Sequence, residues 1–219
     1  MKINDKKKRK NSIYIKIKMI LDVCIALIGI IISMPIMVLI AIAIKIDSKG
    51  PILFKQERNG KNGKKFYVYK FRSMIMENDV HDFTCKDKYT RVGKIIRKLS
   101  LDELPQLFNI LKLEMSFIGP RPWIVDYYEH MTQEQRGRYD VLPGLTGLAQ
   151  VNGRNDLSIF DKINYDLEYR DNISLMLDIK IVLLTIKVVL SKKGVNAGKG
   201  VIHKELKDLR EQNKTLLEV

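Results

Sequence analysis

The sequence predicts a mostly helical α+β protein attached to a membrane, and three observations support this fold class. Residues 23–44 contain no charged side chain, and a helix of that length reaches about 33 Å, enough to cross the hydrocarbon core of a bilayer. Residues 52–72 have the pattern of a small β-hairpin, with two strand-like runs around two Asn-Gly pairs. Apolar residues in 104–111 recur with the period of a helix.

The chain divides into four parts, since 219 residues fit one domain with an appended membrane element. A basic segment before the apolar run would be attracted to anionic lipid headgroups. The predicted parts are a basic N-terminal tail (1–18), a membrane helix (19–48), the main domain (49–190) and a charged C-terminal tail (191–219).

The composition narrows the classes of partner and cofactor. The formal net charge is +14, from 39 Lys and Arg against 25 Asp and Glu. This excess suits anionic lipid, nucleic acid or phosphorylated substrates, and alone it does not choose among them. Cys24 and Cys85 are far apart, so no disulfide framework is expected. The three histidines are scattered and form no metal-ligand cluster with the cysteines. Because no disulfide is expected, a reducing, cytoplasmic setting is the default for the soluble part.

The apolar run is open to two interpretations. Basic residues flank it on both sides, so the positive-inside rule gives it no direction. Pro35 lies in mid-run, where a helix would break, and the Ser33 hydroxyl is able to satisfy a freed carbonyl. A spanning helix with a proline kink is the commoner case, and a re-entrant helix that turns back is the alternative. At the head of the run, Asp22 is expected to pair with Lys18.

Two adjacent carboxylates, Asp102 and Glu103, stand at a predicted helix start. Pro105 is tolerated in a first turn, which places that start near residues 100–103. Negative charge is favoured there by unpaired N–H groups and the helix dipole. The simpler interpretation is a cap, made by Asp102 or by Ser100 with Glu103 in a capping box.

Four basic residues are candidates to accompany these carboxylates. Strand alternation places Lys70 and Arg72 on one face of the second hairpin strand, although such pairs are usually solvated. Arg97 belongs to a short basic helix and precedes Asp102 by five residues. Arg121 lies in Gly-Pro-Arg-Pro, where two prolines restrict the backbone.

Sequence patterns in the rest of the main domain predict a glycine-rich loop and two helices. Residues 142–154 contain three glycines and suggest a loop that approaches a ligand closely, or an ordinary surface loop. They match neither the phosphate-loop nor the dinucleotide fingerprint. Residues 132–135 resemble a capping box, so a helix should run to about Tyr139. Residues 173–190 are apolar with three charges and predict an interfacial or core helix.

Taken together, these stretches resemble the bacterial sugar transferase family, the monotopic phosphoglycosyl transferases that start lipid-linked glycan assembly. The resemblance extends over about residues 18–190. Many members have Ser directly before the membrane proline, whereas here Met34 intervenes. The motifs that carry the resemblance are KIDSKGP (45–51), QERNG (56–60), YKFRSM (69–74), SLDELPQ (100–106), GPRP (119–122) and PGLTG (143–147).

The resemblance implies an activity, a location and an architecture. Members transfer a sugar-1-phosphate from a UDP-sugar to a polyprenyl (undecaprenyl) phosphate and release UMP. This reaction initiates exopolysaccharide, capsule, O-antigen or glycoprotein glycan assembly. The implied protein is monotopic, with a re-entrant helix and interfacial amphipathic helices. Residues 49–190 then form a catalytic domain on the cytoplasmic face of the bacterial inner membrane, in contact with anionic lipid.

The resemblance also implies roles for individual residues. Asp102 is the nucleophile that forms a covalent phosphosugar intermediate, and Glu103 is its partner in metal or proton handling. Mg²⁺ is the implied cofactor, held by these two carboxylates. Carboxylates are recognised nucleophiles toward phosphoryl groups, and anionic attack needs cations that offset charge. The candidate phosphate-binding residues are Lys70, Arg72, Arg97 and Arg121, and those for sugar or nucleotide are Gln150, Asn152 and Arg154.

Three other interpretations are weaker. A membrane-anchored basic protein that binds nucleic acid would explain the charge, but the sequence has no nucleic-acid recognition motif. A metal-dependent Asp-x-Asp glycosyltransferase lacks its triplet, which 166–168 (Asp-Leu-Glu) approaches most closely. An inactive scaffold is disfavoured by the intact Asp-Glu pair. The sugar, the role of the C-terminal tail and the oligomeric state stay open, with a homodimer as one candidate.

Overall fold

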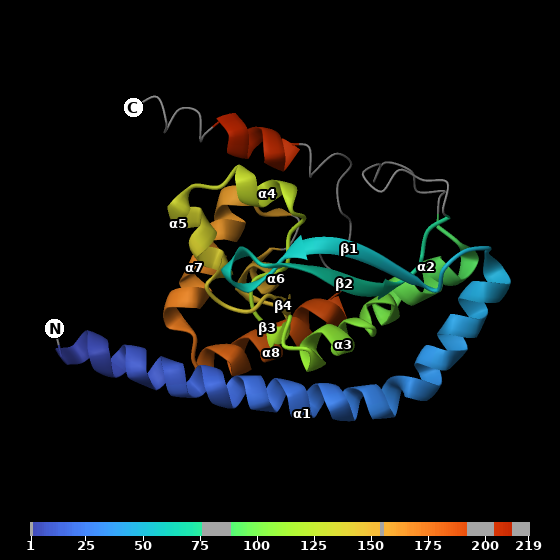
Figure 1. The fold of residues 1–219 in the computed structure, drawn as a ribbon, viewed down its shortest axis with the longest axis horizontal. Coiled ribbons are helices and arrows are strands. Elements are labelled where there is room, and N and C mark those ends of the chain that lie inside the picture. Colours follow the sequence, from blue (N-terminus) through green and yellow to red (C-terminus); the bar gives the residue numbers. More distant parts are fainter. Residues whose placement is uncertain (1, 76–88, 154–155, 192–203, 212–219) are drawn as a thin grey trace.

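One long helix, α1 (Lys2–Asp47), underlies the molecule. The computed structural model describes residues 2–75, 89–153, 156–191 and 204–211. In Figure 1, α1 runs below the other elements, and its C-terminal part turns upward toward α2. Among the described residues, the segment Ser12–Asp47 of this helix is long and apolar enough to cross a membrane.

Pro35 lies inside α1, so the predicted break is a bend within one continuous helix. A proline removes one backbone hydrogen bond and clashes with the preceding turn, which accounts for the bend. The expected role of Ser33 is wrong in detail. Its hydroxyl donates to the carbonyl of Gly29 at 2.6 Å, whereas Pro35 deprives Ile31, four residues earlier, of its usual donor. The Ser33 hydroxyl therefore does not replace the hydrogen bond that Ile31 loses, and instead binds a carbonyl one helical turn before its own residue.

Residues 23–44 of α1 carry no charged side chain, and only one stripe of this part packs against the protein. Ala26 and Ile44 are at most 1% exposed within that stripe, while Ile32 and Leu39 on the opposite side are 71% and 67% exposed. Soluble proteins rarely expose a contiguous apolar surface of this extent, so the outer side of α1 is suited to lipid.

The predicted hairpin is confirmed as β1 (Leu53–Asn59) and β2 (Lys65–Phe71), which pair antiparallel from Leu53↔Phe71 to Asn59↔Lys65. A short turn, η1 (Lys61–Gly63), joins the strands. Asn62 and Gly63 have φ angles of 57° and 72°, the left-handed conformation that an Asn-Gly pair adopts most readily. Phe66 and Val68 of β2 join the core beneath the hairpin.

Three short helical elements follow the hairpin and connect it to α1. They are α2 (Arg91–Lys98), η3 (Leu101–Glu103) and α3 (Gln106–Leu111). α3 packs on α1 near Gly29, where a Cβ would lie 3.4 Å from Leu107, an ordinary van der Waals contact. α2 confirms the short basic helix expected before the carboxylates.

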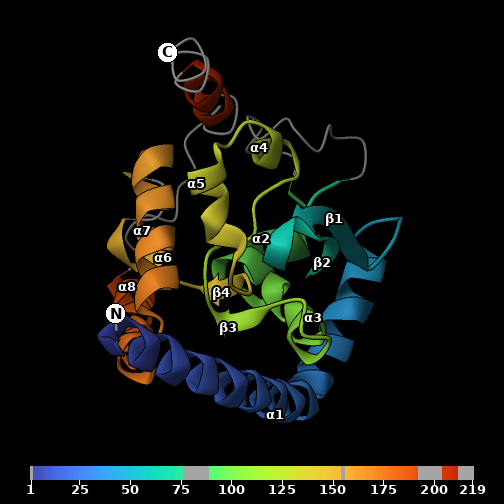
Figure 2. The same cartoon turned by 60° about the vertical axis from the view of Figure 1, so that its left-hand side comes forward.

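Helices surround a two-stranded parallel sheet in the other half of the molecule (Figure 2). Its strands are β3 (Ser116–Ile118) and β4 (Gly144–Thr146). The helical elements are α4 (Asp126–Glu129), α5 (Gln133–Arg136), η4 (Gly137–Tyr139), α6 (Leu148–Asn152), α7 (Ile159–Asn172) and α8 (Leu175–Ser191), and residues 204–211 are also helical.

The expectation of a loop over residues 142–154 is wrong, because this segment supplies β4 and α6. The glycines serve close backbone packing: a Cβ on Gly144 would lie 2.2 Å from the nitrogen of Gly119. The capping box at Thr132 is confirmed, and its helix continues through η4 to Tyr139. The apolar helix expected at 173–190 is confirmed as α8.

A buried polar network fixes α1 to α8 and β3. The Lys18 ammonium lies 3.7 Å from Asp22, as predicted, and 3.1 Å from Asp178 of α8. The hydroxyl of Tyr14 donates to Asp178 at 2.7 Å, and that of Ser116 donates to Asp22 at 2.7 Å. Because buried charges are stable only when paired, this network sets one position of α1 against the domain.

Candidate active site

The two carboxylates lie on η3, a single turn between α2 and α3. Ser100 lies between α2 and η3 in the left-handed conformation, with a φ of 56°, and its side chain makes no capping hydrogen bond. α3 begins after Pro105, also without a side-chain cap. The capping interpretation therefore does not explain Asp102 and Glu103, and the turn leaves both side chains available for chemistry.

Glu103 is held by two cations from different parts of the chain. Its Oε1 lies 2.6 Å from Lys70 Nζ and 3.3 Å from Arg121 Nη2. Burial disfavours the ionised carboxylate, but the charges of Arg121 and Lys70 outweigh this effect and lower the pKa of Glu103 to about 2. Burial also lowers the pKa of Lys70, an effect that Glu103 opposes. Glu103 is thus ionised at neutral pH.

Asp102 is in a different environment, although it is the next residue. It is 8% exposed, and no basic side chain among the described residues forms an ion pair with its carboxylate. Burial raises the pKa of Asp102, Lys70 and Arg97 lower it, and Glu103 raises it further. A carboxylate that is poorly solvated and unpaired is more reactive as a nucleophile than one engaged in a salt bridge.

Three of the candidate basic residues act on the carboxylate pair: Lys70 and Arg121 contact Glu103, and the charge of Arg97 lowers the pKa of Asp102. Arg97 stacks over the ring of Tyr89, with 4.7 Å from its guanidinium carbon to the ring centre, and its charge reaches Asp102. Arg121 extends from its proline-rich turn, and its side chain is half exposed. Fixed cations at such positions suit a phosphorylated substrate that approaches the pair from solvent.

Arg72 is not brought to the carboxylates by the structure. Its guanidinium donates to the carbonyls of Ser48 and Lys49 and to the Ser48 hydroxyl, just beyond the end of α1. The strand pairing ends at Phe71, so the alternation that placed Arg72 beside Lys70 does not extend to it. Arg72 fixes the segment that follows α1, and these contacts give no support to phosphate binding by this residue.

The three candidates for sugar or nucleotide recognition have different outcomes. Asn152 donates from Nδ2 to the carbonyl of Leu148 at 2.8 Å, so its side chain is engaged within α6. Both polar atoms of the Gln150 amide are buried without a partner in the described structure, beside the contact between Gly119 and Gly147. Arg154 lies outside the described residues. Gln150 is therefore the strongest of these candidates.

Two arginines that the sequence reasoning missed support the turn that carries Arg121. Arg138 is 1% exposed, pairs with Asp166 at 2.7 Å and donates to the Arg121 carbonyl at 2.8 Å. Arg58 donates to the carbonyl of Pro122 at 3.4 Å, and burial with the nearby charge of Arg121 lowers its pKa to about 10. Arg58 belongs to the QERNG motif (56–60), whereas no local sequence pattern indicates a role for Arg138.

The residues present fit Mg²⁺ held together with a substrate. The described residues contain no group of three or more His, Cys, Asp or Glu side chains arranged for a metal ion. Mg²⁺ is commonly bound by one or two carboxylates plus substrate phosphates, and Asp102 with the second oxygen of Glu103 supplies such a set. The donor chemistry therefore agrees with a metal that arrives with a phosphorylated ligand.

These features define a class: a protein with a long apolar helix whose buried carboxylate and ordered cations are suited to phosphoryl transfer. The chain belongs to the bacterial sugar transferase family, because the sequence model of that family matches residues 13–192. The resemblance inferred from the motifs is thereby confirmed.

Three relatives show how the match is distributed. The chain is 45% identical to the sugar transferase EpsL of Bacillus subtilis (strain 168), across 73% of this chain and 81% of EpsL. It is 44% identical to UDP-glucose:undecaprenyl-phosphate glucose-1-phosphate transferase of Klebsiella pneumoniae, across 80% and 40% of the two chains. It is 42% identical to UDP-N-acetylgalactosamine-undecaprenyl-phosphate N-acetylgalactosaminephosphotransferase of Aeromonas hydrophila, across 83% and 45%. The chain thus spans less than half of the latter two proteins.

Proposed function

We propose that this protein transfers a sugar-1-phosphate from a UDP-sugar to undecaprenyl phosphate, through a covalent intermediate on Asp102. The observation that carries the proposal is the contrast within the pair: Glu103 is neutralised by Lys70 and Arg121, while Asp102 is buried and unpaired by any described basic side chain. Two relatives are named for transferring sugar phosphate from UDP-sugars to undecaprenyl phosphate, which supports this choice of donor and acceptor.

In the first step, a carboxylate oxygen of Asp102 attacks the phosphorus that carries the sugar. A bond between this oxygen and phosphorus forms, the bond to the UMP oxygen breaks, and UMP leaves with the electron pair. In the second step, an oxygen of undecaprenyl phosphate attacks the same phosphorus. The diphosphate bond of the product forms, and the bond to Asp102 breaks, with its electron pair returning to the carboxylate.

The basic residues offset the charge that gathers in both steps. Arg121 and Lys70 already surround Glu103, and substrate phosphate oxygens extend the same network. Burial raises the pKa of Asp102, and the positive charge of Arg97, five residues earlier, acts against this by favouring the ionised carboxylate. Mg²⁺, when bound, supplies further positive charge to the phosphate oxygens. Because the intermediate stores the phosphosugar, donor and acceptor need not be bound together.

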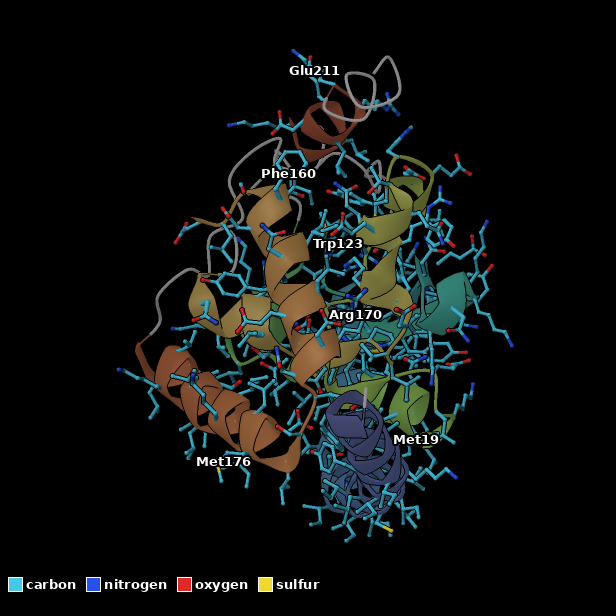
Figure 3. All side chains as sticks on the ribbon, turned by 90° about the vertical axis from the view of Figure 1, so that its left-hand side faces the viewer. Met19, Trp123, Phe160, Arg170, Met176 and Glu211 are labelled. Carbon is cyan, nitrogen blue, oxygen red and sulfur yellow. The ribbon has the colours of Figure 1, made fainter. Side chains whose placement is uncertain are left out.

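The apolar surfaces indicate how the protein meets the bilayer. In Figure 3, Met19 of α1 and Met176 of α8 lie toward the lower end of the view, opposite Glu211. Met176 is 76% exposed, and several other apolar residues of α8 are exposed in the same way. The bend of α1 and the basic residues on both of its flanks support a re-entrant, monotopic arrangement on the cytoplasmic face of the inner membrane. Anionic lipid suits the net charge of +14.

A donor screen tests the proposed function. Purified protein, undecaprenyl phosphate and Mg²⁺ are combined with a panel of UDP-sugars that includes UDP-glucose and UDP-N-acetylgalactosamine, and UMP release is measured. At least one donor should release UMP, and removal of Mg²⁺ by a chelator should stop the release. If no donor releases UMP above a protein-free control, the proposal is wrong. The relatives differ in their sugar, so the panel also identifies the substrate.

Topology is tested separately by labelling single cysteines in a protein whose own cysteines are replaced by serine. Lys8→Cys lies before the apolar run and Lys61→Cys lies in the hairpin turn. A re-entrant α1 predicts that an impermeant reagent labels both from the cytoplasmic side. Labelling from opposite sides would show that α1 spans the membrane.

A further inference from the structure

α2 is anchored firmly along its inner side. Thr90 caps the helix by accepting a hydrogen bond from the backbone N–H of Gly93, and the N–H of Val92 donates to Asp47 at 2.9 Å. Gly93 faces backbone so closely that a Cβ would lie 2.0 Å from the carbonyl oxygen of Ser73. Ile96 is 3% exposed and packs with residues of the second half of α1. The helix is thus a rigid platform.

The outer side of α2 is amphipathic and directly precedes the catalytic turn. Ile95 and Leu99 are one helical turn apart and are 60% and 61% exposed. Lys94 and Lys98, also one turn apart, form a basic ridge beside them, and both residues are exposed. α2 contains four basic residues and no acidic one. Single exposed apolar residues are common, but an apolar pair along a basic ridge is the pattern of a helix that meets an amphipathic anion.

We propose that this outer face of α2 binds the polyprenyl phosphate acceptor, an inference that rests on the proposed function. Ile95 and Leu99 contact the isoprene units nearest the phosphate, and Lys94 with Lys98 attracts the phosphate itself. Two observations select this ligand. The apolar pair is exposed on a helix that packs against the second half of α1, where Ile46 is also 81% exposed. The basic ridge complements a phosphate group at the water–lipid boundary.

The location also meets the requirement of the second chemical step. Leu99 is joined through Ser100 and Leu101 to Asp102, so a phosphate on α2 is close to the phosphorus held by the nucleophile. The helical period places Arg97 on the side of α2 opposite the apolar pair. The charge of Arg97 acts on Asp102. An acceptor phosphate therefore passes from the Lys94–Lys98 ridge toward Arg97 and the catalytic turn without leaving the interface.

The two half-reactions separate this inference from the proposed function. In detergent micelles, exchange of labelled UMP into the UDP-sugar without acceptor reports the donor step alone. The double variant Ile95→Asn/Leu99→Asn should exchange UMP at the wild-type rate, while its KM for undecaprenyl phosphate rises about tenfold, the effect of losing two apolar contacts. Lys94→Gln/Lys98→Gln should also raise that KM and leave the exchange unchanged.

The matched control is Ile179→Asn/Leu183→Asn, a pair with the same spacing on α8, whose members are 45% and 62% exposed. This control should leave the KM for the acceptor unchanged. An unchanged KM for undecaprenyl phosphate in both α2 variants would overturn the assignment. A rise in the α8 control equal to that in the α2 variants would also overturn it, because α2 would then only contact lipid. If wild-type protein shows no UMP exchange with any donor, the covalent mechanism itself fails.

Discussion

Replacing Lys70 with methionine tests how the carboxylate pair is tuned. The lowering of the Glu103 pKa from 4.5 to about 2 corresponds to about 3 kcal/mol of preference for the ionised form, at about 1.4 kcal/mol per pKa unit. Lys70 and Arg121 share this effect, so removal of one cation should raise the Glu103 pKa by about one unit. Lys70 also lowers the pKa of Asp102, which should therefore rise in the variant.

The sign of the pH effect follows from these directions. A carboxyl whose pKa is depressed on folding stabilises the protein above its unfolded pKa, and this contribution is lost as the pH falls from about 4.5 toward 2. In Lys70→Met this contribution should be smaller, and its loss should be complete at a higher pH than in the wild type. The acid limb of the donor half-reaction should also shift to higher pH, because Asp102 must be ionised to attack.

The assay is the pH profile of UMP release in single-turnover conditions. Lys70→Met should lower the rate at neutral pH about 100-fold, the usual effect of deleting one group that stabilises transition-state charge. The control is Lys65→Met on the same strand, because Lys65 is largely exposed and pairs only loosely with Glu57 at 3.5 Å. A Lys70→Met profile with the wild-type rate and an unmoved acid limb would refute the reasoning.

Two further substitutions test the supports of the site. Arg138→Met leaves Asp166 buried without its partner and should lower the free energy of unfolding by about 3–5 kcal/mol, as measured by denaturant titration; a loss below about 1 kcal/mol contradicts the role of this pair. Gly144→Ala places a Cβ 2.2 Å from the Gly119 nitrogen and should displace the turn that carries Arg121. Its KM for the donor should rise, whereas Gly29→Ala, with 3.4 Å to its nearest contact, should be nearly neutral.

Features set by neighbouring residues were the ones that the sequence predicted well. The hairpin followed from its Asn-Gly pairs, because Asn62 and Gly63 adopt the left-handed conformation that such a turn needs. The capping box at Thr132 is equally local. The Asp102–Glu103 pair was located from its short motif, and the structure added that Lys70 and Arg121 converge on one oxygen of Glu103.

Features set by contacts between distant segments were missed. β4 forms because the chain near Gly144 meets Gly119, a contact that the glycine-rich pattern of a loop conceals. Arg72 looked like a partner of Lys70, but the end of α1 supplies its acceptors, and no strand pattern indicates that approach. Arg138 has no motif of its own, and its importance depends on burial with Asp166.

The central claim is tested most directly by trapping the intermediate. Protein is mixed with a UDP-sugar labelled in its sugar, without acceptor, and quenched in denaturant before the label on the polypeptide is measured. Wild-type protein should carry about one label per chain, released by added undecaprenyl phosphate, and peptide mapping should locate the label at Asp102. Asp102→Asn should carry none while keeping the wild-type unfolding transition. Label on the Asp102→Asn protein, or wild-type rates of lipid product from it, would contradict the account.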